Sequence, residues 1–248
     1  MIGPDIAISE SLRWIDLTGV AANALLGGVL ARAERLDPVG FGVLAILSGL
    51  GGGMIRDTLL QHGPPIALTD YPYILTALAG AMVAFLLPVE GRLWDRAFPY
   101  VDALALGCWA AAGAQKTLVV GLGWMAAVLL GTITAVGGGM VRDVVLRRIP
   151  AVFGGNNTLY ATSALLASGV MVVFYRLGQS NLGLAASTLV GAGLTLAAGW
   201  RGWHLPGAPA WKPGLVGLRY PRPRWRRDNR QSAAPAEEDE APPDRRSP

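Results

Sequence analysis

Long apolar runs, separated by short polar or proline-bearing connections, dominate the chain up to about residue 200. The hydrocarbon core of a bilayer is about 30 Å thick, so a helix that crosses it needs about 20 mainly apolar residues, or fewer where flanking side chains reach the interface. This measure predicts seven transmembrane helices, at roughly 14–32, 38–60, 71–88, 99–118, 121–146, 157–176 and 181–200. We therefore expect an all-α polytopic membrane protein.

One motif occurs twice and relates the two halves of this pattern. Gly51-Gly52-Gly53-Met54-Ile55-Arg56-Asp57 returns 86 residues later as Gly137-Gly138-Gly139-Met140-Val141-Arg142-Asp143. The same offset matches further residues: Asp16 with Asp102, Gly27 with Gly113, Ser48 with Thr134, and Pro64 with Pro150. A period of this length is too long for a solenoid repeat and indicates a duplicated half-domain.

The offset carries the first three predicted helices onto the next three and leaves the seventh unpaired. Because three is an odd number, the second unit must enter the membrane from the opposite side, which makes the pair an inverted-topology repeat. Permeation or substrate sites in such proteins lie near the midplane, between the halves. We predict a first three-helix repeat at 14–88, an inverted second repeat at 99–176, a seventh transmembrane helix at 181–200 and a tail at 201–248.

Composition agrees with a membrane location. The chain is 52% hydrophobic and only 15% charged, and between Ala97 and Val141 the only charged residues are Asp102 and Lys116, which no soluble surface would tolerate. Acidic residues, but no basic stretch, precede the first apolar run, so we interpret that run as a retained helix rather than a cleaved signal peptide.

Basic residues in the connections predict the orientation. Three arginine pairs and the arginine-rich tail fall on one side of the predicted membrane: Arg32 with Arg35, Arg92 with Arg96, and Arg147 with Arg148. The positive-inside rule then places the N-terminus outside and the C-terminus in the cytoplasm, in a multi-pass protein of the cell inner (plasma) membrane. We expect the tail to be disordered and to contact anionic membrane lipids; nucleic acid is not an expected partner, because no folded module accompanies the arginines.

The glycine triplets need a reason, because each glycine costs roughly 1 kcal/mol relative to alanine in a water-exposed helix. One reason is close helix packing. Another is a break that frees backbone groups, which a membrane tolerates only against protein or along a water-filled path. Since the triplets are symmetric and charges follow both, we favour kinks at Gly51–Gly53 and Gly137–Gly139 that line a pathway.

Charged pairs follow both triplets, Arg56-Asp57 and Arg142-Asp143. Ionisable groups in a membrane are costly, so these pairs are candidates for electrostatic control of an ion path; the alternative is that they reach the interface from helix ends. Neighbouring residues diverge by about 100° on a helix, so pairing across the halves, Arg56 with Asp143 and Arg142 with Asp57, is open. We expect Lys116, near the end of the fourth predicted span, to reach the interface, with gating or charge pairing as the alternative.

Hydroxyl and carboxyl groups complete the candidate site. Ser48 and Thr134 precede the triplets by three residues and could coordinate a partly dehydrated cation, or bond to a carbonyl one turn earlier. Asp16 and Asp102 lie near the predicted starts of the first and fourth spans, where a helix N-terminus favours an anion, so we expect them to cap or position, with substrate contact as the alternative.

Nothing in the chain indicates catalysis. Cys108 is the only cysteine and His62 and His204 the only histidines, so no recognisable metal cluster can be assembled. The sequence contains neither a phosphate-binding loop nor a serine nucleophile elbow. We therefore expect no enzymatic activity, no cofactor and no bound metal beyond transient K⁺ or Na⁺.

The doubled Gly-Gly-Gly-Met-x-Arg-Asp motif, the duplicated three-helix units and the seventh helix resemble the prokaryotic branch of the trimeric intracellular cation (TRIC) channel family, over about residues 14–200. The resemblance implies a homotrimer with one K⁺- and Na⁺-conducting pore through each subunit, between the second and fifth helices and kinked at the glycine triplets. Animal members carry a lysine where Gly138 stands and use it with an arginine for an inositol lipid. That departure argues against inositol-lipid control here, whereas another anionic lipid could meet Arg142.

A monovalent cation channel is thus the leading hypothesis. A secondary transporter of a small zwitterionic solute such as glycine is the alternative, because inverted repeats and broken helices occur in both classes, and similar sequences have been described as glycine transporters. Single-channel currents would identify a pore, and slow saturable counterflow a carrier.

Overall fold

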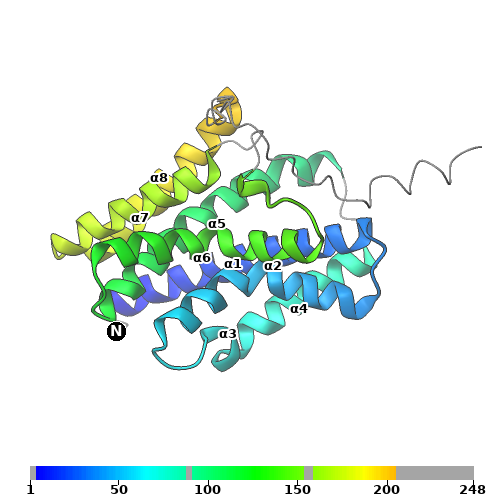
Figure 1. The fold of residues 1–248 in the computed structure, drawn as a ribbon, viewed down its shortest axis with the longest axis horizontal. Coiled ribbons are helices and arrows are strands. Elements are labelled where there is room, and N and C mark those ends of the chain that lie inside the picture. Colours follow the sequence, from blue (N-terminus) through cyan, green and yellow to red (C-terminus); the bar gives the residue numbers. More distant parts are fainter. Residues whose placement is uncertain (1–3, 88–90, 154–158, 205–248) are drawn as a thin grey trace, which may run out of the picture. The chain divides into compact units, whose positions relative to one another are not determined.

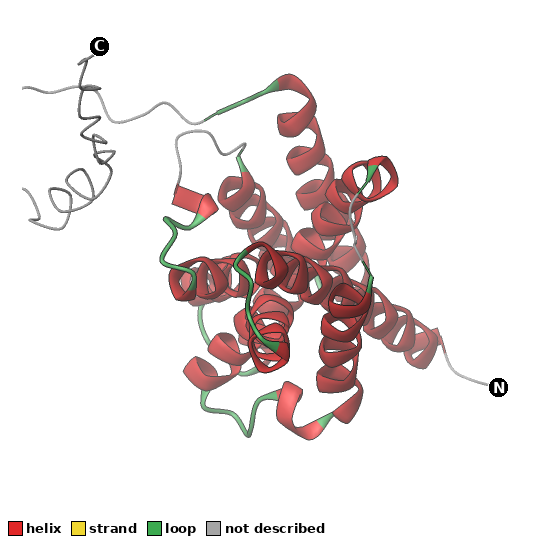
Figure 2. Cartoon of the chain, turned by 90° about the vertical axis from the view of Figure 1, so that its right-hand side faces the viewer, coloured by secondary structure: helices red, strands yellow, loops and turns green. Residues whose placement is uncertain are grey.

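The computed structural model describes residues 4–87, 91–153 and 159–204, and every regular element in these ranges is a helix (Figures 1 and 2). The elements are α1 (Pro4–Ala33), α2 (Pro38–Leu60), α3 (Ile66–Thr69), α4 (Tyr71–Leu86), α5 (Arg92–Val119), α6 (Trp124–Val145), a 3₁₀ turn (Ala151–Phe153), α7 (Tyr160–Arg176) and α8 (Ser180–Arg201). The all-helical architecture predicted from the sequence is confirmed for the described residues.

Among the described residues, four stretches of helix are long and apolar enough to cross a membrane: Pro38–Leu60, Trp94–Val119, Trp124–Val145 and Ser180–Arg201. α4 and α7 are apolar but shorter. Large apolar side chains such as Leu75, Leu129 and Leu189 are exposed on the helix surfaces. A soluble protein would bury most of this surface, whereas in a membrane protein it faces lipid.

Several helix boundaries differ from the predicted ones. α1 and α5 begin earlier than expected, and Pro99, the predicted start of the fourth span, lies inside α5. A proline removes one helical hydrogen bond, which neighbouring helices and side chains can offset in a membrane protein. α6 begins only at Trp124, because Gly121, with a left-handed φ of 91°, lies in the turn that follows α5. Beyond His204 the predicted tail lies outside the described residues.

The 86-residue offset also relates helix ends and turns. α1 ends at Ala33 and α5 at Val119, and α2 and α6 begin at Pro38 and Trp124. The left-handed residues recur in the same way: Arg35 with Gly121, and Gln61 with Arg147. The equivalence seen in the sequence therefore extends to the backbone of the connections.

Small side chains let the helices approach closely. The buried core consists largely of alanine, including Ala24, Ala77, Ala110 and Ala164, which are fully buried. α1 packs on α2, α4 and α5; α5 packs on α6, α7 and α8; and α2 packs on α6 (Figure 1). This is the small-residue packing typical of membrane helices, and it brings the two motif-bearing helices into contact.

Candidate functional site

α2 and α6 contact each other through the two glycine triplets. A Cβ atom placed on Gly51 would lie 3.2 Å from Gly138 Cα, and one placed on Gly137 would lie 3.1 Å from Gly52 Cα. Residue numbers rise along one helix as they fall along the other, so the helices cross antiparallel. Arg56 and Arg142, which follow the triplets, therefore lie at opposite ends of this contact.

The backbones themselves touch at the centre of the contact. A Cβ on Gly52 would overlap the carbonyl oxygen of Thr134, and a Cβ on Gly138 would overlap that of Ser48. Both helices are continuous over Pro38–Leu60 and Trp124–Val145. The expected break in the helices is wrong for this structure, because the glycines make room for the backbone of the neighbouring helix while their own helix stays continuous. A kink without a break stays a prediction.

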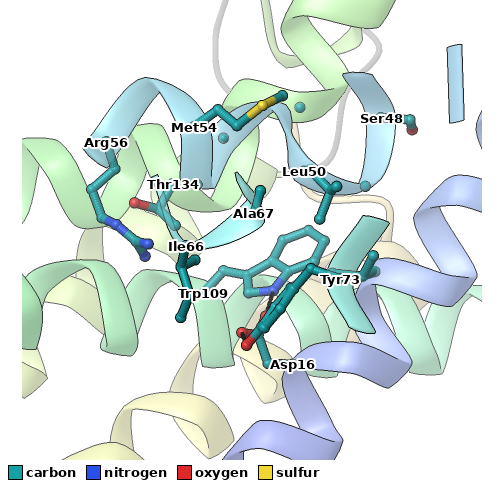
Figure 3. Close-up of a pocket in the computed structure, with 15 residues that line it drawn as sticks. Asp16, Ser48, Leu50, Met54, Arg56, Ile66, Ala67, Tyr73, Trp109 and Thr134 are labelled. Atoms are coloured by element: carbon teal, nitrogen blue, oxygen red, sulfur yellow. Dashed lines mark hydrogen bonds between the residues drawn. The ribbon is translucent and has the colours of Figure 1, made fainter. Parts of the chain in front are cut away.

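A cavity of about 40 Å³, the Asp16 cavity, lies at the α2 end of this contact, next to Gly53, Met54 and Arg56 (Figure 3). The Asp16 carboxylate accepts two hydrogen bonds there, from Tyr73 Oη and from Trp109 Nε1, each at 2.6 Å. Tyr73 belongs to the same half of the chain and Trp109 to the other. A volume of this size holds at most a few water molecules or one bare cation.

A larger cavity of about 220 Å³, the Asp102 cavity, lies at the α6 end, next to Gly139 and Arg142. Asn23 Nδ2 donates to Asp102 Oδ1 at 3.3 Å, and the side chain of Tyr160 is also hydrogen-bonded to Asp102. Each cavity thus contains one carboxylate that is held by a tyrosine and by a donor from the opposite half of the chain.

The offset of 86 residues relates the two cavities to each other. It matches Asp16 with Asp102, Gly53 with Gly139, Arg56 with Arg142, and Asn23 with Trp109. The last match was missed in the sequence, because asparagine and tryptophan look unrelated; what they share is a side-chain N–H. The predicted capping role of the two aspartates is wrong, because α1 and α5 begin well before them and both carboxylates face cavities.

Each arginine of the motif pairs with the aspartate that follows it. Arg56 Nε lies 2.8 Å from Asp57 Oδ1, and Arg142 Nη2 lies 2.8 Å from Asp143 Oδ1. All four side chains are at most 10% exposed. The interpretation that they reach the interface from helix ends does not hold, since they are buried between helices. Breaking a buried pair of this kind typically costs about 3–5 kcal/mol.

Lys116 joins one of these pairs from the other half of the chain. Its Nζ lies 2.8 Å from Asp57 Oδ1, and Asp57 Oδ2 accepts from the backbone N–H of Ile66 at the start of α3. The Lys116 side chain is 37% exposed, so it makes this pair near the surface. The geometry shows a charge pair for Lys116, which is one of the roles considered for it. The offset places Leu30 at the equivalent position.

The two hydroxyl candidates both line the Asp16 cavity but differ in their bonds. Thr134 Oγ1 donates to the carbonyl of Leu130 at 2.6 Å, one turn earlier, which is the structural alternative considered for it. Ser48 Oγ accepts from Arg142 Nη1 at 3.3 Å. Ser48 therefore links α2 to the charged pair of α6. In the described ranges no cluster of three or more His, Cys, Asp or Glu side chains is arranged to hold a metal ion.

The family model described as "Glycine transporter" matches the chain in two segments, residues 13–88 and 99–176. Among curated proteins the chain is similar to a UPF0126 membrane protein of Deinococcus radiodurans, with 37% identity over 66% of this chain and 76% of that protein. It is also similar to the UPF0126 inner membrane protein YadS of Escherichia coli (strain K12), with 33% identity over 77% of this chain and 92% of that protein.

Two solved structures have the same fold. One, described for conductance through TRIC cation channels, has a TM-score of 0.74 and 31% identity and covers 79% of this chain and 96% of its own. The other is the TRIC trimeric intracellular cation channel orthologue from Rhodobacter sphaeroides, with a TM-score of 0.69, 27% identity, and coverage of 77% of this chain and 98% of its own. The similarity spans nearly the whole length of the two solved chains and more than three quarters of this one.

Proposed function

This chain belongs to the prokaryotic TRIC channel family and also matches the glycine transporter family model, and we propose that it is a channel for the monovalent cations K⁺ and Na⁺. Each subunit carries its own pore between α2 and α6. The pore runs from the Asp16 cavity past the glycine contact to the Asp102 cavity. The observation that carries this proposal is the pair of matched carboxylate cavities at opposite ends of one antiparallel helix contact.

The two carboxylates favour cations along this path. A carboxylate in a narrow, partly dry cavity attracts cations and repels anions more strongly than it would in water. Arg56 and Arg142 line the same cavities, but each is paired with an aspartate, which reduces the positive potential there. The cavities therefore present carboxylates that are hydrogen-bonded to uncharged donors, while the arginines are neutralised by their aspartates.

Conduction requires α2 and α6 to separate, because the glycine contact leaves no space for an ion. The carbonyl oxygens of Ser48 and Thr134 lie at this contact, and separation would expose the path beside them to water. Oxygen dipoles of this kind replace part of an ion's hydration shell in selective pores. The closed contact is thus the gate, and the charged pairs at its two ends stabilise the closed state.

The inverted repeat, the homotrimer and the orientation belong to the same proposal. The antiparallel crossing of equivalent helices supports two units of opposite orientation, with the seventh helix, α8, outside both. The R. sphaeroides relative is described as trimeric, which supports a homotrimer. Arg32 and Arg142 lie in the last turns of α1 and α6, and Arg147 and Arg148 follow α6, at the helix ends that the positive-inside rule places in the cytoplasm.

Planar-bilayer recording of the purified protein in asymmetric KCl tests the channel. We expect a reversal potential close to the K⁺ equilibrium value, and a shift toward zero in the Asp16→Asn and Asp102→Asn variants. Asp70→Asn is the matched control, because Asp70 pairs with Arg13 at the surface and lines neither cavity. A reversal at the Cl⁻ value, or equal shifts in all three variants, would contradict the proposed path.

A secondary transporter of a small zwitterion such as glycine is the second candidate. The observation that favours it is the closed contact between two separate cavities, each holding a carboxylate and an arginine, which are the groups that would receive the two charges of an amino acid. Liposomes that contain the protein distinguish the two. Saturable counterflow of glycine without K⁺ current would establish the carrier, and K⁺ flux without glycine counterflow would establish the channel.

A further inference from the structure

A third cavity, of about 780 Å³, lies between α5, α7 and α8. We refer to it as the α5–α8 cavity. It is lined by Asp95, Phe98 and Tyr100 of α5 and by Thr195 and Trp200 of α8. It also contains Asp102 and Tyr160, so the hydrogen-bonded Asp102–Tyr160 pair belongs both to this cavity and to the proposed path.

One polar group of this cavity has no hydrogen-bond partner among the described residues. The hydroxyl oxygen of Thr195 is buried and accepts or donates no hydrogen bond within the described part of the chain. A buried hydroxyl without a partner is costly, and a ligand with an N–H or O–H donor would satisfy it.

Aromatic rings and negative charge occur together here. The rings of Tyr100 and Trp200 meet edge-on with centroids 6.3 Å apart, and both side chains are exposed at the cavity. The charged residues of the lining are two carboxylates, Asp95 and Asp102, and one guanidinium, Arg96. Aromatic faces beside carboxylates are the chemistry that recognises organic ammonium groups, through cation–π attraction and charge.

We propose that the α5–α8 cavity binds a lipophilic amine, a protonated ammonium on a compact hydrophobic body. The ammonium lies among Asp95, Tyr100 and Trp200 and donates to the hydroxyl oxygen of Thr195. The hydrophobic body lies against Leu196 and Gly199 of α8, where a Cβ on Gly199 would meet nothing within 4 Å, so the space is open. An anion would meet net negative charge, and a neutral molecule would leave the carboxylates unused.

The occupied cavity has a consequence for conduction, and this part rests on the proposed function. Asp102 and Tyr160 separate the α5–α8 cavity from the proposed path. A fixed ammonium next to Asp102 repels cations that enter the Asp102 cavity. A bound amine therefore lowers cation flux from its place in the α5–α8 cavity, without entering the contact between α2 and α6.

Equilibrium dialysis of the full-length protein in a maltoside detergent, which carries no ammonium group, tests the site with 1-adamantylamine at neutral pH. We expect saturable binding near one molecule per chain. 1-Adamantanol and 1-adamantanecarboxylate have the same cage without the positive charge, and both should bind at least about tenfold more weakly. Equal binding of the alcohol and the amine, or no saturable binding above that of protein-free micelles, would overturn the proposal.

Matched variants locate the site. Asp95→Asn and Trp200→Ala should each weaken amine binding roughly tenfold. Trp203→Ala is the control, because Trp203 lies just beyond α8, contacts Arg201 and does not line the cavity. Asp95 is exposed at the start of α5, so its variant keeps the test valid if the Trp200 variant fails to fold. Equal weakening by Trp203→Ala would place the amine elsewhere.

K⁺ flux into liposomes tests the consequence separately. The amine should slow flux through the wild-type protein and have less effect on Trp200→Ala, whose flux without amine stays at the wild-type rate. Binding that leaves flux unchanged would overturn the proposed coupling and keep the site. A protein that binds the amine and conducts no cation would refute the channel alone, since dialysis measures binding without any flux.

Discussion

Replacing single glycines within one triplet tests whether the triplets serve helix contact. Gly52→Ala places a methyl group onto the Thr134 carbonyl oxygen, which belongs to backbone and cannot rotate away. Overpacking of this kind typically costs about 1–3 kcal/mol. In Gly53→Ala the nearest atom would be Arg56 Nη2 at 3.8 Å, an ordinary contact with the end of a flexible side chain. Both variants gain the same helix propensity, roughly 1 kcal/mol, so their difference in unfolding free energy isolates the contact at about 1–3 kcal/mol.

The assay is thermal unfolding of the purified variants in one detergent, followed by fluorescence and by loss of the size-exclusion peak. For a chain of this size 1 kcal/mol shifts the midpoint by about 2–4 °C, so Gly52→Ala should unfold about 2–12 °C below Gly53→Ala. The pair Gly138→Ala and Gly139→Ala provides an internal repeat, because Gly138 faces the Ser48 carbonyl and Gly139 only Arg142 Nη2 at 3.7 Å. Equal midpoints within each pair would refute the assignment of the triplets to helix contact.

Three further predictions follow from the charges and the crossing. Asp57→Ala leaves Arg56 buried without its carboxylate and should cost about 3–5 kcal/mol in unfolding free energy, measured by the same melts. Lys116→Gln should change stability by less than about 1 kcal/mol, because Lys116 is partly exposed; a larger loss would mean that Lys116 holds the halves together. Gln61→Cys and Arg147→Cys, at equivalent exposed turns, should react with an impermeant maleimide from opposite faces of oriented vesicles, and labelling from one face would exclude the inverted repeat.

The helices could be predicted from the sequence because apolar length is a strong signal, and the motif-bearing helices α2 and α6 lie close to their predicted ranges. The first and last residues of the helices were harder to predict. α5 continues through Pro99 toward its N-terminus, since charged residues such as Asp95 and Arg96 can stay exposed outside an apolar core. Hydropathy measures where a helix can be buried in lipid, and a helix that extends past the bilayer gives no such signal.

The motif located the centre of the site, but the sequence left its chemistry open. Glycine is compatible with both a break and a close approach, and only the position of the Thr134 carbonyl decides between them. The pairing of Arg56 with Asp57 could not be predicted either, because it depends on side-chain rotamers and on Lys116, which comes from another helix. The sequence did contain a signal for the carboxylate cavities, which is the match of Asp16 with Asp102. Their hydrogen-bond donors Asn23 and Trp109 resemble each other only in that both carry a side-chain N–H.

The lysine that reaches Asp57 has a leucine as its counterpart in the other half, so the duplicated units differ in fixed charge at this position. In a conducting channel, unequal charge at the two entrances makes inward and outward currents unequal at voltages of the same size. The direction of this rectification would report which way each molecule was inserted in an artificial bilayer. Exchanging Lys116 for leucine should make the current–voltage curve more nearly straight.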